Sequence, residues 1–123
     1  MPVRSLNSSV LKWPDAETVG QAVRRWAQEV VRDRSGVVRI GYYGSYARGD
    51  WGVGSDLDLV VVVEASGEPF WRRPAGWDIT KLPVPADLIV YTIEEWCSFD
   101  RQTQMYRTLT EETVWVYIRE DGQ

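Results

Sequence analysis

The first clear pattern of apolar residues along the chain is helical, and it follows a polar leader over residues 1–14. From Asp15 onward the apolar positions recur three or four apart, which is the spacing of a helix that buries one face. These positions are Ala16, Val19, Val23, Trp26, Ala27, Val30 and Val31. Asp15 suits the N-cap of this helix, and Ser35 and Gly36 suit its end. Its other positions carry arginines that form either a solvated surface or a basic stripe for a partner: Arg24, Arg25, Arg32 and Arg34.

Three short runs of β-branched and aromatic residues follow, and each predicts a strand: Val37–Tyr43, Asp56–Glu64 and Ala86–Thr92. The second run has an unbroken aliphatic half, which indicates a strand that helices bury on both faces. Between the second and third strands the chain is rich in Pro, Gly and Trp. This composition predicts a long loop with room for one helical turn.

The last third of the chain begins with a helix signal. Residues Thr92 to Glu95 have the Thr-x-x-Glu form of a capping box, which predicts a helix that carries Trp96 and Phe99. The pattern leaves open whether this helix runs unbroken to Leu109. Residues Thr113–Ile118 alternate as expected of a short edge strand. Together these elements predict one α+β domain over residues 15–118, with a small mixed sheet of three to four strands flanked by helices and a tail over 119–123.

Length and charge restrict the classes of function. A chain of 123 residues forms one domain and has no room for a second, substrate-binding domain, so an enzyme of this size must borrow substrate surface. The net charge of -4 argues against strong nucleic-acid binding, which normally needs a basic face. Cys97 is the single cysteine, which excludes an internal disulfide. No apolar run is long enough to cross a membrane, and we expect a cytoplasmic protein.

The candidate chemistry lies at the start of the most apolar strand, where two aspartates stand two positions apart. Residues at this spacing project from the same face of a strand, so Asp56 and Asp58 could hold divalent cations. The alternative is an edge strand with one solvated face. Gly44 and Ser45 favour a site, because a glycine turn before a helix N-terminus suits a phosphate group. Asp87 would join the pair if the second and third strands are adjacent, and Mg²⁺ would relieve the repulsion among three acids.

The stretch GYYGSYARGDWGVGSDLDLVV, residues 41–61, resembles the signature of the DNA polymerase beta superfamily of nucleotidyltransferases. It is most similar to the minimal nucleotidyltransferase branch, in which Gly-Ser-x-Ala-Arg-Gly precedes Ser-Asp-x-Asp. The matching positions are Gly44, Ser45, Ala47, Arg48, Gly49, Ser55, Asp56 and Asp58. The order of elements extends the resemblance over roughly residues 15–118, and it implies a nucleotidyltransferase fold like the palm of DNA polymerase beta.

The resemblance also implies an activity, which is transfer of a nucleoside monophosphate, with ATP as the expected donor, to a hydroxyl with release of pyrophosphate. The residues that it implies as catalytic and as ligands of two Mg²⁺ ions are Asp56, Asp58 and Asp87. The residues that it implies in nucleotide binding are Gly44, Ser45, Arg48 and Ser55. Asp87 could accept the proton of the attacking hydroxyl. A capping contact or a surface ion pair is the alternative role for Arg48.

Members of this branch are typically encoded beside HEPN proteins, which are RNase toxins, and some transfer AMP to a tyrosine of that partner. The resemblance therefore implies a protein adenylyltransferase that acts as the antitoxin of a HEPN protein encoded nearby. One alternative is a small-molecule nucleotidyltransferase of the aminoglycoside-modifying type, although such proteins usually carry an additional helical domain. Another is a non-catalytic antitoxin that neutralises its toxin by binding.

The sequence leaves the roles of four side chains open. Trp51 either stacks on the base or a partner, or packs on its own domain. Arg72 and Arg73 stand beside a tryptophan and either contact a partner or lie in a solvated loop. Lys81, just before the third strand, is a candidate to neutralise pyrophosphate.

Overall fold

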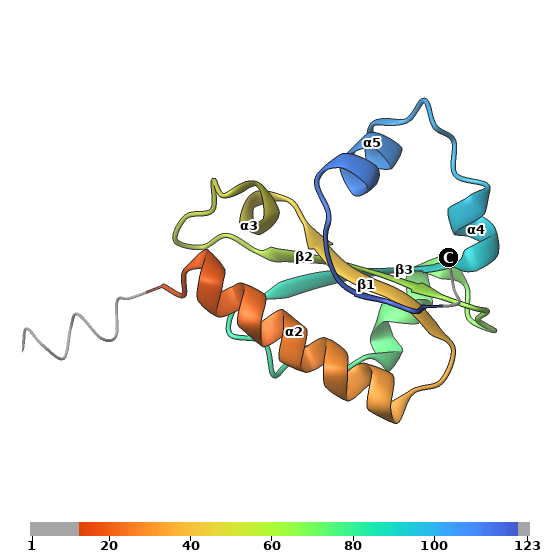
Figure 1. The fold of residues 1–123 in the computed structure, drawn as a ribbon, viewed down its shortest axis with the longest axis horizontal. Helices are drawn as coiled ribbons and strands as arrows, with labels where there is room; N and C mark the ends of the chain where they lie inside the picture. Colours follow the sequence, from red (N-terminus) through yellow and green to blue (C-terminus); the bar gives the residue numbers. More distant parts are fainter. Residues whose placement is uncertain (1–12, 121–123) are drawn as a thin grey trace, which may run out of the picture.

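The computed structural model describes residues 13–120, so most of the proposed leader and part of the tail lie outside it. Its centre is a four-stranded sheet in the order β3-β2-β1-β4 (Figure 1). β1 pairs antiparallel with both β2 and β4, whereas β2 and β3 are parallel. The elements in chain order are α2 (Ala16–Asp33), β1 (Val37–Tyr43), α3 (Ser45–Arg48), β2 (Leu57–Val63), the 3-10 helix η1 (Phe70–Gly76), β3 (Ala86–Thr92), α4 (Ile93–Cys97), α5 (Gln104–Glu111) and β4 (Val114–Ile118). The α+β prediction is therefore confirmed.

The two faces of the sheet are covered by different helices. α2 lies along one face, and α4 and α5 lie on the opposite side (Figure 1). Asp15 caps α2 by accepting a hydrogen bond from the amide of Thr18 at 2.9 Å, and Val19 and Val23 are fully buried beneath the helix. Every residue of β2 except Asp58 is buried, which confirms the expected burial on both faces.

The predicted helix after Thr92 is shorter than expected. The capping box forms as predicted, because the Glu95 amide donates to Thr92 Oγ1 at 3.2 Å and the Thr92 amide donates to Glu95 Oε1 at 2.9 Å. α4 nevertheless ends at Cys97, and Phe99 lies beyond it. A turn at Asp100, whose carboxylate accepts from the Gln102 amide, separates α4 from α5. Two strands are also slightly shorter than predicted, since β2 spans Leu57–Val63 and β4 begins at Val114.

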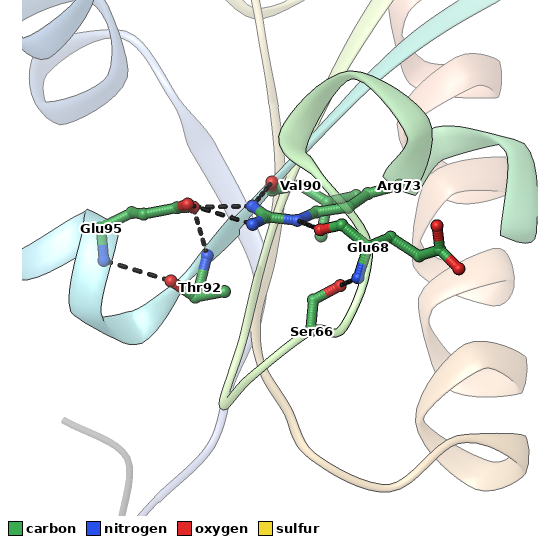
Figure 2. A network of polar contacts seen from close by, with 6 residues as sticks. All are labelled: Ser66, Glu68, Arg73, Val90, Thr92 and Glu95. Carbon is green, nitrogen blue, oxygen red and sulfur yellow. Dashed lines mark hydrogen bonds and ion pairs between the residues drawn. The ribbon is translucent and has the colours of Figure 1, made fainter.

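Arg73 corrects a sequence-based expectation. It lies in η1 rather than in a solvated loop, and only 9% of it is exposed. Its guanidinium donates to both carboxylate oxygens of Glu95, at 2.7 and 3.0 Å, and to the carbonyl oxygens of Val90 at 2.9 Å and Glu68 at 3.0 Å (Figure 2). The Arg73 hydrogen bond holds the pKa of Glu95 below its ordinary value. We call these contacts the Arg73 network. It ties η1 to the end of β3 and to the start of α4.

Another cation of the crossover between β2 and β3, Lys81, lies against α2. Lys81 Nζ is 3.4 Å from Glu29 Oε1 of that helix. This ion pair occupies the side of the sheet that α2 covers. Within residues 13–120 no helix has the length and hydropathy needed to cross a membrane.

Candidate functional site

Three polar side chains occupy one row across the sheet. Tyr43 of β1 is the register partner of Asp58 of β2, and Asp58 is in turn the register partner of Asp87 of β3. Residues that are directly opposite in neighbouring strands project from the same face. The sequence-based condition for a third acid, adjacency of the second and third strands, is therefore met. We call Tyr43, Asp58 and Asp87 the acid row.

The carboxylates of this region disfavour one another's charge. Asp58 is half-buried, and its pKa is raised by burial first and then by Asp87 and Asp56. Asp56 lies just before β2 and is exposed, as is Asp87. In the described part of the chain no lysine or arginine forms an ion pair with any of the three acids. The charge of Arg48 acts in the opposite direction and lowers the pKa of Asp58, but the site still presents negative charge that no ion pair within the described residues neutralises.

Tyr43 is a residue that the sequence-based reasoning missed. Burial, followed by the charges of Asp58, Tyr91 and Asp87, raises the pKa of Tyr43 to about 12. Its phenol is therefore neutral near neutral pH and able to donate a hydrogen bond at the edge of the acid row. Its place immediately before the Gly44-Ser45 turn was the only available signal, because its face depends on the pairing of β1 with β2.

Gly44 brings the chain backbone directly against the Asp58 carboxylate. A Cβ atom at this position would overlap Asp58 Oδ2, and the backbone has φ 82° and ψ -153°, a region that is almost exclusive to glycine. α3 begins at the next residue, Ser45, and the first amide groups of a helix lack intrahelical acceptors. Gly44 therefore brings the backbone at the start of α3 beside a carboxylate, which is an arrangement able to hold a phosphate group together with a cation.

The other two predicted nucleotide-binding residues lie at the rim of this region. Arg48 is exposed, and its guanidinium contacts Asp50 Oδ2 at 3.1 Å and Glu112 Oε1 at 3.3 Å. These are the surface ion pairs that the sequence left open as an alternative. Ser55 Oγ accepts a hydrogen bond from the Gly52 amide at 2.8 Å and so closes the turn before β2. A contact between nucleotide and either residue stays a prediction.

Trp51 packs on its own domain. Its ring stacks on that of Tyr46, with centroids 5.6 Å apart and an interplanar angle of 9°. The Tyr46 hydroxyl accepts a hydrogen bond from Trp13 Nε1 at 2.6 Å. The three aromatic residues support α3 and the turn that follows it, so Trp51 has a structural partner inside the domain.

The donors of the acid row fit a magnesium ion that arrives with its substrate. Within residues 13–120 no group of three or more Asp, Glu, His or Cys side chains, the three aspartates included, is placed to hold a metal ion on its own. Mg²⁺ usually takes one or two carboxylates and completes its shell with water and substrate phosphates, so an open set of hard oxygen donors is suitable. Asp58, with Asp56 and Asp87 beside it, offers such a set next to the backbone of Gly44.

Similar arrangements of elements occur in solved structures. A protein from Sulfolobus solfataricus with a provisional nucleotidyltransferase assignment superposes with a TM-score of 0.62 at 19% identity, covering 87% of this chain and 86% of its own. A toxin–antitoxin structure with AMP-PNP gives 0.55 at 16% identity, covering 80% and 75%. The toxin–antitoxin MntA-HpeT with two Asp-to-Glu substitutions gives 0.53 at 13% identity, also covering 80% and 75%. At these identities the likeness shows a shared fold.

Sequence comparison supplies the family. No curated protein matches the chain significantly. The model of the nucleotidyltransferase domain, however, matches residues 24–116, which include α3, the acid row and all four strands up to Val116. The structural likeness, the three neighbouring acids and the Gly44-Ser45 turn agree with this match. The chain therefore belongs to the nucleotidyltransferase domain family.

Proposed function

We propose that this chain is a Mg²⁺-dependent nucleotidyltransferase that moves AMP from ATP to a hydroxyl group of a partner protein. The observation that carries the proposal is the in-register pairing of Asp58 with Asp87 beside the backbone of Gly44. A phosphate-binding turn and uncompensated carboxylates in one place are what phosphoryl transfer requires, because that chemistry depends on positioning and charge neutralisation.

Each part of the site has a role in this reaction. The backbone at Gly44 and Ser45 binds the phosphates, and Asp56, Asp58 and Asp87 would hold Mg²⁺, which supplies charge neutralisation on the triphosphate when bound. Of the register partners Asp58 and Asp87, Asp87 is the exposed one, and it accepts the proton of the attacking hydroxyl. The new bond joins that oxygen to the α-phosphorus, while the bond from the α-phosphorus to the bridging oxygen breaks and pyrophosphate leaves. The neutral phenol of Tyr43 donates a hydrogen bond at the same edge.

The likeness to toxin–antitoxin proteins supports a protein as the acceptor. Two of the similar structures are toxin–antitoxin proteins, one of them with AMP-PNP, an analogue of ATP. The MntA-HpeT structure carries two Asp-to-Glu substitutions two positions apart, which is the spacing of Asp56 and Asp58 here. These likenesses support an antitoxin role toward a HEPN-type toxin encoded nearby.

The test is incubation of the purified chain with α-labelled ATP, Mg²⁺ and the product of the neighbouring gene. We expect label on that protein, loss of labelling with EDTA, and loss of labelling in Asp58→Asn. Glu120→Gln, which removes an exposed carboxylate outside the site, is the matched control and should label normally.

Two other outcomes would replace the proposal. Label on an added aminoglycoside, with none on the protein, would identify a small-molecule nucleotidyltransferase. Neutralisation of the toxin that survives Asp56→Asn combined with Asp58→Asn would identify an antitoxin that acts by binding alone.

A further inference from the structure

A groove runs between α2 and the edge strand β4, on the opposite side of the sheet from the acid row. It encloses about 390 Å³. α2 contributes a stripe of side chains at helical spacing, of which Ala27 and Val31 are apolar and Arg24 and Arg32 are basic. Val116 and Tyr117 of β4 complete the lining. The groove therefore has an apolar centre and a basic rim.

The outer edge of β4 adds backbone hydrogen-bonding groups to this groove. β4 pairs on one side with β1, and within the described chain no strand pairs with its other side. Its residues are all apolar or aromatic, and Ile118 is 47% exposed. The opposite edge strand, β3, differs because η1 packs against it and the Arg73 network holds η1 there. An uncovered apolar edge is a template for a further strand.

The charge of the rim indicates what kind of strand would pair there. The whole chain has a net charge of -4, yet the groove carries two arginines. Arg32 is partly balanced by its neighbour Asp33, at 3.0 Å, whereas Arg24 forms no ion pair within residues 13–120. A second copy of the chain, paired edge to edge, would bring the two Arg24 and Arg32 stripes toward each other. Charge complementarity therefore favours an acidic occupant over a second copy.

We propose that this groove docks an extended segment of the partner protein as a fifth strand on β4, with both acidic and apolar residues among the every-second positions that face α2. The segment's apolar side chains contact Val31 and Val116, and its carboxylates face Arg24 and Arg32. The inference rests on the proposed function only for the identity of the partner, which would be the protein that accepts the nucleotide. Docking at a surface away from the acid row leaves the site itself free for the acceptor hydroxyl.

The first test uses a short synthetic peptide in which every second residue is in turn Glu or Val and the residues between them are Thr (the Glu-Val peptide), added to the isotopically labelled full chain without nucleotide or Mg²⁺. We expect NMR shift changes in residues 114–118 and along the groove side of α2. The same peptide with Lys in place of Glu should bind about tenfold more weakly. The Glu-Val peptide N-methylated at alternate amides should also bind about tenfold more weakly, because it cannot complete the strand pairing. Shift changes elsewhere, or equal binding of the Glu and Lys peptides, would overturn the proposal.

Charge variants of α2 provide the matched comparison. Arg24→Glu should weaken binding of the Glu-Val peptide about fivefold, whereas Arg25→Glu, on the same helix but outside the groove, should leave it nearly unchanged. Gln28→Lys adds a cation to the groove and should strengthen binding about twofold, an effect that a damaged fold would not produce. Equal weakening by Arg24→Glu and Arg25→Glu would contradict a specific groove. A dimer of the chain alone that the peptide dissociates would assign the edge to a second copy.

The labelling assay separates this inference from the proposed function. If the neighbouring gene's product is labelled with the same KM by the unchanged chain and by Arg24→Glu, the groove does not dock the acceptor, although the transfer activity stands. If the peptide binds in the groove and no protein is labelled, the docking surface stands and the transfer proposal fails.

Discussion

The two ends of the β2–β3 pair differ in whether the chain supplies partners for the charged side chains there. At one end Asp58 and Asp87 lie side by side, with Asp56 close enough to raise the pKa of Asp58 further. At the other end the single charge of Arg73 is buried, and Glu95 and two carbonyl oxygens satisfy it (Figure 2). Both ends belong to the same two strands. Charged side chains that are buried or close to one another stabilise a fold only where the chain itself supplies their partners.

This contrast separates a structural group from a functional one. The Arg73 network supplies every partner from within the chain, and so its role is complete in the isolated domain. Under the proposed function, the acids take their partners from the substrate and its cation, at some cost in stability. A strongly polar cluster without internal compensation is therefore the better indicator of a binding site.

The largest expected effect is at the acid end. Asp58→Asn should lower kcat/KM for nucleotide transfer at least about 1000-fold, or about 4 kcal/mol, because it removes the central carboxylate of the row. The same change should raise the free energy of unfolding in EDTA, because it relieves repulsion from Asp56 and Asp87. Kinetic labelling and urea denaturation measure the two effects. A variant that is both inactive and less stable would mean that Asp58 is structural.

The next largest expected effect is a loss of stability at the end of the strands that the Arg73 network occupies. Arg73→Met keeps much of the apolar stem but leaves Glu95 and the Val90 carbonyl without their donor, and should lower the free energy of unfolding by about 3 kcal/mol. Arg72→Met, at an exposed neighbouring position, should change it by less than about 0.5 kcal/mol. Urea denaturation measures both values. Equal losses in the two variants would show that the network adds no stability.

Gly44 tests the contact between backbone and carboxylate. Gly44→Ala should lower the free energy of unfolding by about 2 kcal/mol, because it forces an unfavourable φ and moves Asp58, and transfer should also fall. Gly49→Ala is the control, since Gly49 also has a positive φ, 91°, but no atom lies within 4 Å of its Cβ position. Gly49→Ala should lower the free energy of unfolding by less than Gly44→Ala does, and it should leave transfer nearly unchanged. Similar transfer in both variants would mean that the approach of Gly44 to Asp58 has no catalytic role.

The smallest expected effect is on the pH dependence of stability, to which Asp58 and Glu95 contribute with opposite sign. The raised pKa of Asp58 means that the folded chain binds its proton more tightly than the unfolded chain, so the Asp58 contribution to stability falls as pH rises above about 4. The lowered pKa of Glu95 means that its contribution is present above about pH 4 and is lost as the pH falls further. Unfolding of the unchanged chain, Asp58→Asn and Glu95→Gln in EDTA from pH 3 to 7 should show differences of opposite slope. Parallel slopes would contradict the contrast between the two ends.

The sequence predicted the elements that depend on local pattern. The valine run of β2 and the capping box at Thr92 each carry a local signal, and each is confirmed. Asp87 was expected beside Asp58 only on the condition that the second and third strands are adjacent, and the strand register meets this condition. Arg73 could not be predicted to be buried, because its partner Glu95 stands in another element and reads as part of a cap. Tyr43 was missed for a related reason, since its place in the row follows from strand register.

Parallel strands cannot be joined by a tight turn, so Asp87 reaches Asp58 only after the whole crossover between β2 and β3 has closed. Gly44 directly follows β1, and Asp58 lies in β2. These two strands are consecutive in the chain and antiparallel, and their pairing closes a shorter loop. Contacts of greater sequence separation slow folding, because the loop entropy is lost before the contact is gained. We therefore expect the proposed phosphate-binding turn to assemble before the third carboxylate joins the site, so that all three acids come together only once the crossover between β2 and β3 has closed.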